Sequence, residues 1–283
     1  MNIKLDDDIN SYEGFFDHQW AKKFSSLVES TKLSDAAFNL CAEWKGISNA
    51  RRLLWLMMNG LKDAVDSALN SHTPFPLQVI QGLVKRIADQ VETHRISLSP
   101  QDRAALCSEI QGIESQIIQK LHDNPVSEDL NQIWATYLKE PEILLAIWMS
   151  EINAFRSIYF AYESFLIKTV EIATRRQGLR ANDLERELRD LFGENVLQTC
   201  WTDEAIDLPR LIRHALVHNG FKPTGELGSR YKGKFLVEDG KIVIMAHHTN
   251  QLFHSMKESA LFFVNEAIKL DSLKPKHRPE KVD

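Results

Sequence analysis

The sequence predicts an all-α protein with one short β-hairpin near the C-terminus. Apolar residues recur at spacings of three and four along almost the whole chain, which is the pattern of amphipathic helices. Only 12 glycines and 9 prolines occur among 283 residues, so long helices can run without interruption. One pair of β-branched runs flanks Asp239-Gly240, and Asp-Gly between such runs is a strong hairpin signal.

In chain order, we expect helices at roughly 11–30, 34–45, 48–70, 76–95, 100–122, 128–139, 141–177, 183–192, 208–219 and 250–271. Ser99 marks the start of the helix at 100–122, because serine is a good N-cap, Pro100 suits the first helical position and Asp102 supplies an early acid. Turn-forming residues at 122–125 interrupt the pattern. We therefore divide the chain into an N-terminal helical region, 1–124, and a C-terminal helical domain, 125–283.

The N-terminal region shows no recognisable chemistry. Its histidines, His72, His94 and His122, are isolated in the sequence, and each is interpreted as a surface residue. The pair Arg51-Arg52 adjoins an apolar helix and is interpreted as a solvated helix start.

The longest predicted helix, 141–177, carries a sustained apolar stripe that is typical of a bundle core. The stripe consists of Leu144, Trp148, Ile152, Phe155, Tyr159, Tyr162, Leu166, Val170 and Ala173. Glu163 lies at its edge, one turn after Tyr159.

The hairpin is expected from 234–238 and 241–245, and cations gather around its start: Lys222, Arg230, Lys232 and Lys234. They either supply positive charge to a neighbouring cleft or form a solvated basic loop, and the two interpretations have equal weight. The charged, proline-broken tail at 274–281 is expected to be disordered or to make a loose electrostatic contact.

Composition favours a soluble, cytoplasmic protein. The formal net charge of −5 argues against a general nucleic-acid coating protein, although a local basic site remains compatible with it. The three cysteines, Cys41, Cys107 and Cys200, show neither a disulfide framework nor zinc-site spacing, as expected in a reducing compartment. The N-terminus is acidic where a signal peptide is basic, and the apolar run 53–58 is too short to cross a membrane.

No metal or other cofactor is expected. Glycine-rich phosphate loops are absent from the sequence. His247-His248 with His254 is the nearest approach to a metal-ligand cluster, but adjacent histidines point apart on a strand and no acidic cluster accompanies them.

The segment 208–220 contains the most informative pattern in the chain. We expect a helix of about three turns with Asp207 as its N-cap, Pro209 in its first turn and Gly220 just past its end. At about 100° per residue, one face is apolar and contains Leu208, Leu211, Ile212, Ala215 and Leu216. The opposite face contains Arg210, Arg213, His214, Val217 and His218. Guanidinium groups bind phosphate oxygens and imidazoles exchange protons near neutral pH, so this face suits a phosphodiester.

The sequence Arg213-His214-Ala215-Leu216-Val217-His218, followed by Asn219-Gly220, resembles the R-x4-6-H motif of HEPN domains. The resemblance covers the C-terminal half of the chain. It implies an up-and-down helical bundle that dimerises, with the Arg and His of two protomers facing each other across a cleft. Many HEPN domains are metal-independent endoribonucleases of toxin, phage-defence or CRISPR systems, and others are inactive scaffolds or nucleotide-binding relatives.

The resemblance also suggests roles for single residues. His218 is the candidate acid/base, Arg213 the group that stabilises the transition state, and Arg210 a ligand of the neighbouring phosphate. His214 and Asn219 are candidate supporting or RNA-binding residues. Acidic side chains on neighbouring helices of HEPN bundles orient the motif arginine. Glu163 is therefore either such a residue or, with more weight from sequence alone, a solvated glutamate.

Arg213 and His218 diverge by about 140° on an ideal helix. They would therefore flank a phosphate, and a two-fold dimer would supply two Arg/His sets to one scissile bond. We expect a metal-independent endoribonuclease that acts on RNA as a homodimer, in phage defence or as the toxin of a toxin–antitoxin pair. The alternatives are an inactive HEPN-like module that binds a nucleotidyltransferase or another partner, and an unrelated helical protein.

Overall fold

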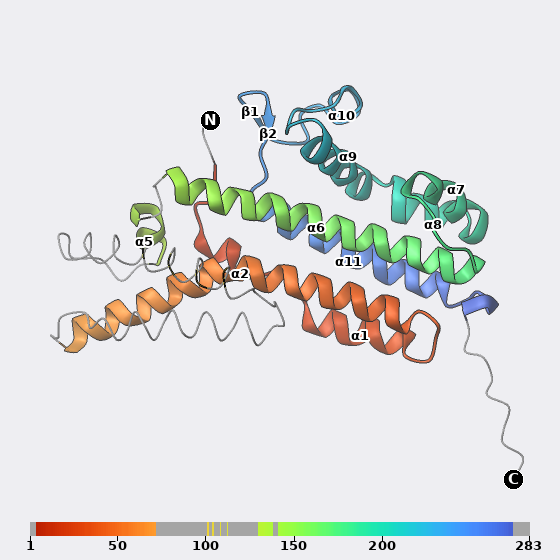
Figure 1. Cartoon of the computed structure of the whole chain (residues 1–283), viewed down its shortest axis with the longest axis horizontal. Coiled ribbons are helices and arrows are strands. Elements are labelled where there is room, and N and C mark those ends of the chain that lie inside the picture. Colours follow the sequence, from red (N-terminus) through yellow and green to blue (C-terminus); the bar gives the residue numbers. More distant parts are fainter. Residues whose placement is uncertain are drawn as a thin grey trace, which may run out of the picture.

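Three long helices form the body of the described part of the chain. They are α2 (Ser34–Ser71), α6 (Pro141–Thr174) and α11 (Ala246–Ala267), and α6 packs against both of the others (Figure 1). The structure is a computed structural model that describes residues 4–71, 130–137 and 141–273, together with the single positions 101, 104, 108 and 112. Helix α1 (His18–Val28) packs against α2 and α11.

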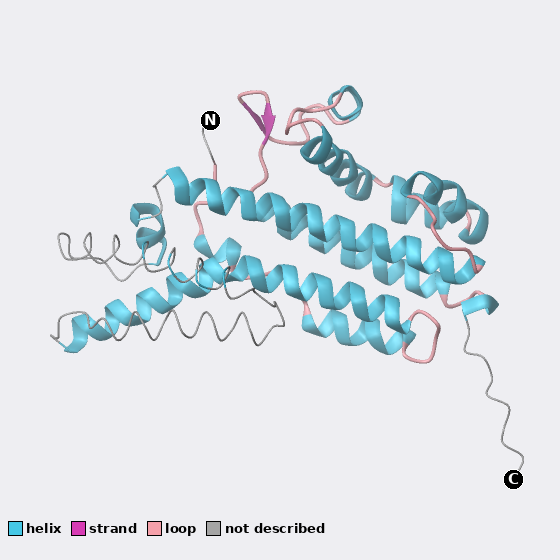
Figure 2. Cartoon of the chain, in the orientation of Figure 1, coloured by secondary structure: helices cyan, strands magenta, loops and turns pink. Residues whose placement is uncertain are grey.

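Shorter elements cover the opposite side of α6 and α11. They are α7 (Ala181–Phe192), α8 (Glu194–Leu197), a π-helical turn (Gln198–Thr202) and α9 (Glu204–His218). Next come α10 (Gly225–Arg230) and the antiparallel strands β1 (Val237–Glu238) and β2 (Lys241–Ile242), which pair with Val237 opposite Ile242. Helix α5 (Leu130–Tyr137) and the 3₁₀ turns Ile9–Tyr12 and Asp271–Leu273 complete the described elements. The predicted all-α class with one short hairpin is confirmed, as Figure 2 shows.

Two predicted helix boundaries at the N-terminal end are wrong. The predicted helix 11–30 begins only at His18, because the Asp17 carboxylate caps it by accepting from the backbone N–H groups of Gln19 and Trp20. The predicted helices 34–45 and 48–70 are one continuous helix, α2. A mid-helix glycine costs only about 1 kcal/mol, and tertiary contacts on both sides of Gly46 outweigh this cost.

The contacts around Gly46 come from Trp44 and Ser48. The buried indole of Trp44 donates to the carbonyl oxygen of Ile158 on α6 over 3.1 Å. The hydroxyl of Ser48 accepts from the backbone N–H groups of Phe15 and Phe16 at 2.9 and 3.0 Å. The two contacts hold α2 against its neighbours on both sides of Gly46.

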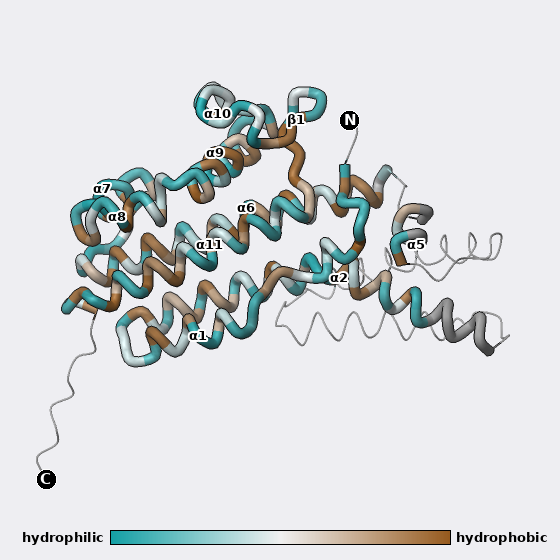
Figure 3. The backbone as a smooth tube through the Cα atoms, turned by 180° about the vertical axis from the view of Figure 1, so that it is seen from behind, coloured by the Kyte–Doolittle hydropathy of each residue, from teal (hydrophilic) through white to brown (hydrophobic). Residues whose placement is uncertain are grey.

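One hydrophobic core includes side chains from α1 and the first half of α2 as well as from α6, α9 and α11. The predicted stripe of α6 belongs to it. Its central members from Trp148 to Val170 are buried, and Leu144 and Ala173 at its ends are half-buried. Hydrophobic residues accordingly recur in bands along α6, α9 and α11 (Figure 3).

Several predictions lie outside the described residues. These are the helix at 76–95, most of the helix at 100–122 with its Ser99 start, the boundary at 122–125, the tail at 274–281, Cys107, and the histidines His72, His94 and His122. Cys41 and Cys200 are free thiols. In the described ranges, no helix combines the length and the apolar character that crossing a membrane requires.

The interpretation of Arg51 as a solvated residue is wrong. Its side chain is 1% exposed, and its Nε lies 2.6 Å from Oε1 of the equally buried Glu151 on α6. Its Nη atoms donate to the Asn250 side chain at 2.7 Å and to the carbonyl oxygens of Ser11 and Ala246 at 2.6 and 3.1 Å. Arg51 therefore joins the N-terminal segment to α2, α6 and α11, which a local sequence pattern cannot show.

Candidate functional site

Helix α9, which carries the Arg/His motif, begins one turn before its predicted start. Asp203 caps it, since its Oδ1 accepts from the backbone N–H of Ala205 over 2.8 Å. Asp207 is therefore inside the helix and is not its N-cap, and Pro209 lies beyond the first turn. Proline is tolerated there because Ala205, whose carbonyl Pro209 cannot bond, is exposed to solvent.

The predicted two faces of α9 are confirmed. Leu211, Ile212, Ala215 and Leu216 are buried and Leu208 is half-buried. His214, Val217 and His218 are exposed, while Arg210 and Arg213 are half-buried.

The end of α9 also agrees with the sequence prediction. Asn219 follows the last helical residue, and Gly220 has φ +57°, a left-handed conformation that glycine adopts without steric cost. The Asn219 amide donates to the carbonyl oxygen of Lys222 at 2.9 Å. Asn219 therefore stabilises the turn behind the helix.

Glu163 contacts the motif arginine. Nη1 of Arg213 donates to Oε2 of Glu163 over 3.1 Å, and the Glu163 side chain is only 8% exposed. Burial raises the pKa of this carboxyl, while the positive charges of Arg213 and Arg210 act in the opposite direction. The interpretation of Glu163 as a solvated glutamate is therefore wrong, and the alternative of a contact with Arg213 matches the geometry.

Two aromatic rings of α6 lie beneath the Arg213 guanidinium. Its Cζ is 5.7 Å from the ring centroid of Tyr159 and 5.9 Å from that of Phe160, both within cation–π range. Tyr159 is fully buried, and its hydroxyl has no hydrogen-bond partner among the residues that the structure describes. Burial raises the pKa of this hydroxyl, so it stays neutral. The side chain of Arg213 is thus held on the side that faces α6. It remains 26% exposed and can reach a ligand.

Arg210 is not free to give its full charge to a phosphate. Its Nε and Nη2 lie 3.0 and 2.5 Å from Oδ1 of the buried Asp207. Oδ2 of the same carboxylate accepts from Nη2 of Arg230 at 2.6 Å and from the Tyr231 hydroxyl at 2.7 Å. Two arginines therefore share the negative charge of Asp207.

The other cations near the hairpin divide into two groups. Lys234 forms an ion pair with Glu204, and Arg230 also pairs with Glu226 at 3.0 Å. Lys222 and Lys232 are exposed. The basic loop thus carries less net charge than its sequence suggested.

The two motif histidines lie side by side on the exposed face. The ring centroids of His214 and His218 are 4.9 Å apart, as expected for residues one turn apart. Neither imidazole has a hydrogen-bond partner within the described part of the chain, so both are accessible to a substrate. Arg213 turns away from them toward α6, in agreement with the divergence expected on an ideal helix.

Sequence reasoning missed one residue near the motif. Phe160 is 55% exposed beside Arg213, whereas Val217, which was predicted on the Arg/His face of α9, is 39% exposed. Helical spacing from Glu163 could have placed Phe160 on this side of α6, but only the packing of α9 shows that the two lie together.

The prediction that the adjacent histidines His247 and His248 lie on a strand is wrong, because both belong to the first turn of α11, and His254 follows on the same helix. Nδ1 of His247 lies 2.7 Å from Asp6, and Nδ1 of His248 accepts from the backbone N–H of Met245 at 3.1 Å. No cluster of three potential metal ligands occurs in the ranges that the structure describes.

Comparisons of the chain with known protein families, with curated proteins and with solved structures found no match.

Proposed function

We propose that this protein is a metal-independent endoribonuclease of the HEPN type. The observation that carries the proposal is an exposed Arg/His face on α9 whose arginine is held by a buried carboxylate. Glu163 restrains one Nη atom of Arg213, and the remaining N–H groups are available for the non-bridging oxygens of a phosphodiester. The exposed imidazoles of His214 and His218 supply groups that can exchange protons.

The proposed reaction needs no external reactant. His218 takes the proton of a ribose 2′-hydroxyl, and the 2′-oxygen attacks the adjacent phosphorus. The bond from phosphorus to the 5′-oxygen breaks, and a protonated imidazole gives its proton to the leaving oxygen. The products are a 2′,3′-cyclic phosphate and a free 5′-hydroxyl. Arg213 stabilises the additional negative charge of the transition state.

One α9 helix does not place Arg213 and His218 on the same phosphate, since Arg213 is drawn toward α6. We propose that a homodimer brings two α9 helices face to face, so that the Arg213 and His218 side chains of both subunits surround one scissile bond. The exposed apolar side chains Phe160 and Val217 border this face and suit a contact with a second copy. The proposed setting is the cytoplasm, in phage defence or as the toxin of a toxin–antitoxin pair.

The same apolar border favours a second candidate function. An inactive HEPN-like module would use Phe160, Val217 and the charged face to bind an antitoxin, a nucleotidyltransferase or another protein. Such a module would leave RNA intact.

The experiment that tests the proposal is RNA cleavage in the presence of EDTA. Purified protein is incubated with single-stranded RNA, and the ends of the products are analysed by mass spectrometry. We expect 2′,3′-cyclic phosphates, and an RNA with 2′-deoxy sugars at the cleavage positions should remain intact. A requirement for Mg²⁺, or cleavage of the 2′-deoxy substrate, would contradict the mechanism.

A mixing experiment tests the shared site. Arg213→Ala and His218→Ala proteins are unfolded, mixed and refolded, which produces dimers with one intact arginine and one intact histidine. The mixture should cleave RNA faster than either variant refolded alone. Equal rates would show that the two subunits do not contribute to one site.

A further inference from the structure

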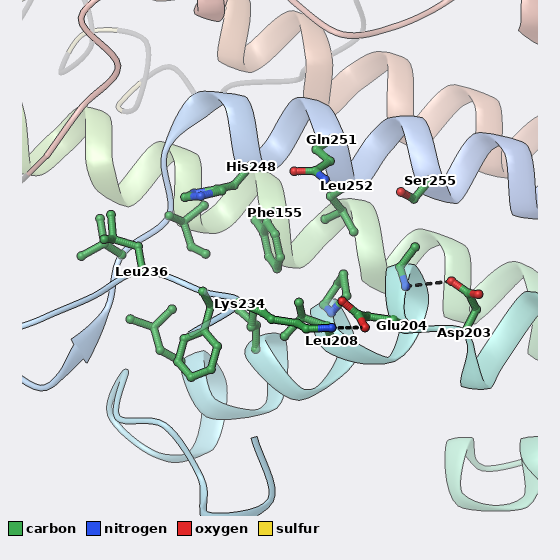
Figure 4. A pocket seen from close by; sticks show the side chains of 17 residues that line it. Phe155, Asp203, Glu204, Leu208, Lys234, Leu236, His248, Gln251, Leu252 and Ser255 are labelled. Carbon is green, nitrogen blue, oxygen red and sulfur yellow. Dashed lines mark hydrogen bonds and ion pairs between the residues drawn. The ribbon is translucent and has the colours of Figure 1, made fainter. Parts of the chain in front are cut away.

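A pocket of about 420 Å³ lies on the other side of α9, between α9, α11 and the chain around the hairpin (Figure 4). Phe155 of α6 lines it, together with Leu208 and Ile212 from the apolar face of α9 and Leu252 of α11. Small-molecule sites in proteins span roughly 300–1,000 Å³ and have mostly apolar walls with a few polar groups. The pocket meets both conditions at the small end of the range.

Three polar side chains of the pocket come from α11. His248, Gln251 and Ser255 follow one another at helical spacing along one edge. Nδ1 of His248 accepts from the backbone N–H of Met245, which places the proton of the neutral ring on Nε2. Burial lowers the pKa of His248 to about 4, so the ring is neutral at pH 7. Nε2–H has no acceptor among the described residues.

The charges around the pocket do not favour an anion. Lys234 is paired with Glu204, and Asp203 is the N-cap of α9. The lining therefore contains two acids and one base, and the base is already neutralised. A carboxylate or phosphate in the pocket would gain no free cation and would meet negative charge.

We propose that this pocket binds a small neutral molecule with a flat, apolar body and a carbonyl-type oxygen that accepts from Nε2–H of His248. The body would lie between Phe155, Ile212 and Leu252, where it buries apolar surface. The carbonyl would supply the acceptor that none of the described residues provides at His248. The site is separate from the Arg/His face, because it uses the opposite side of α9.

The experiment uses three isosteric probes: benzamide, benzoate and benzamidine. They share a ring but are neutral, anionic and cationic, and binding to the full-length protein is followed through the methyl NMR signals of its isoleucines and leucines. We expect benzamide to shift the signals of Ile212 and Leu252 with saturation and to bind more tightly than benzoate and benzamidine. Absence of saturable shifts, or tighter binding of either charged probe, would overturn the proposal.

Two variants test the role of His248. In His248→Asn, the side-chain oxygen can still accept from the Met245 N–H, but the donor at Nε2 is lost. The dissociation constant of benzamide should rise roughly threefold to tenfold, the effect of one hydrogen bond. His254→Asn alters an exposed histidine of the same helix and should leave binding unchanged. Equal affinity of the His248 and His254 variants would overturn the assignment.

A third variant keeps the test decisive if His248→Asn fails to fold. Ser255 is half-buried at the edge of the pocket, so Ser255→Trp places an indole in it from the rim. We expect the benzamide shifts to disappear. Retention of the shifts would show that the probe binds elsewhere and would overturn the proposal.

Discussion

Nη1 of Arg213 lies 3.1 Å from Oε2 of Glu163, although the two residues are 50 positions apart in the chain. The carboxylate belongs to α6 and is buried, while the guanidinium belongs to α9 and reaches the surface. The ion pair therefore fixes one end of Arg213 and leaves the other end accessible. It supports the proposed role of Arg213 in binding a phosphate. Its neighbour Arg210 is held in a similar way by the buried Asp207, which also pairs with Arg230.

Weakening this pair should reduce activity more than stability. Glu163→Gln keeps the shape of the side chain but removes its charge, so Arg213 is held less firmly. We expect RNA cleavage to fall about tenfold or more, because small misplacements of catalytic groups are costly. The melting temperature should change little, since Arg213 is near enough to the surface to regain water. Glu258→Gln, at an exposed position of α11, is the control and should not change the rate.

The buried network of Arg51 should contribute strongly to stability. Arg51→Met removes the guanidinium and leaves Glu151 buried without its ion-pair partner. Breaking a buried pair in this way costs about 3–5 kcal/mol of unfolding free energy. Urea denaturation of this variant should be compared with that of Lys45→Met, which alters an exposed position of the same helix and should cost less than about 0.5 kcal/mol.

The double variant Arg51→Met/Glu151→Leu tests whether Arg51→Met is unstable because Glu151 keeps an unpaired charge or because Arg51 loses its other contacts. It removes both buried charges, so it should be more stable than Arg51→Met alone. A double variant as unstable as the single one would show that the lost contacts of Arg51 with the backbone dominate.

Two neighbouring tyrosines of α6 should respond differently to loss of their hydroxyl groups. The hydroxyl of Tyr162 donates to the Cys200 carbonyl oxygen over 2.8 Å and contacts the Ser259 hydroxyl at 2.6 Å. The hydroxyl of Tyr159 is buried and has no partner in the described ranges. Tyr162→Phe should cost about 1–3 kcal/mol, and Tyr159→Phe should be neutral or stabilising. Equal losses in chemical denaturation would mean that Tyr159 has a hydrogen-bond partner in solution.

His248 should make stability depend on pH. Its pKa in the folded protein is lowered from 6.5 to about 4, so the unfolded chain binds a proton more readily between these values. The free energy of unfolding should therefore fall as the pH drops from 6.5 to 4. His248→Asn lacks this group, and its stability should fall less over the same window. Denaturation at pH 7, 5 and 4 measures the difference, and parallel pH profiles of the two proteins would contradict it.

Periodicity was sufficient to predict the faces of α9 and the core stripe of α6, and Asp239-Gly240 was sufficient to predict the hairpin, because each depends on residues close together in the chain. The strands of the hairpin are shorter than the predicted ranges 234–238 and 241–245. The start of α9 was predicted wrongly because Asp207 and Pro209 resemble a helix start, while the cap at Asp203 depends on the preceding π-helical turn. Arg51 and Glu163 were misinterpreted for a related reason. Their partners lie on other helices, so only the packing reveals that they are buried.

The most direct measurement is the rate of RNA cleavage in EDTA by the wild-type protein and by three alanine variants. Arg213→Ala and His218→Ala should each abolish cleavage while helical content is retained. The melting temperature of His218→Ala should remain nearly unchanged because its side chain is exposed, whereas Arg213→Ala leaves the buried Glu163 without its ion-pair partner and should melt at a lower temperature. His254→Ala, at an exposed position of α11, should cleave at the wild-type rate. Cleavage that persists in Arg213→Ala or His218→Ala, or a wild-type protein that cuts no RNA, would contradict the proposed function.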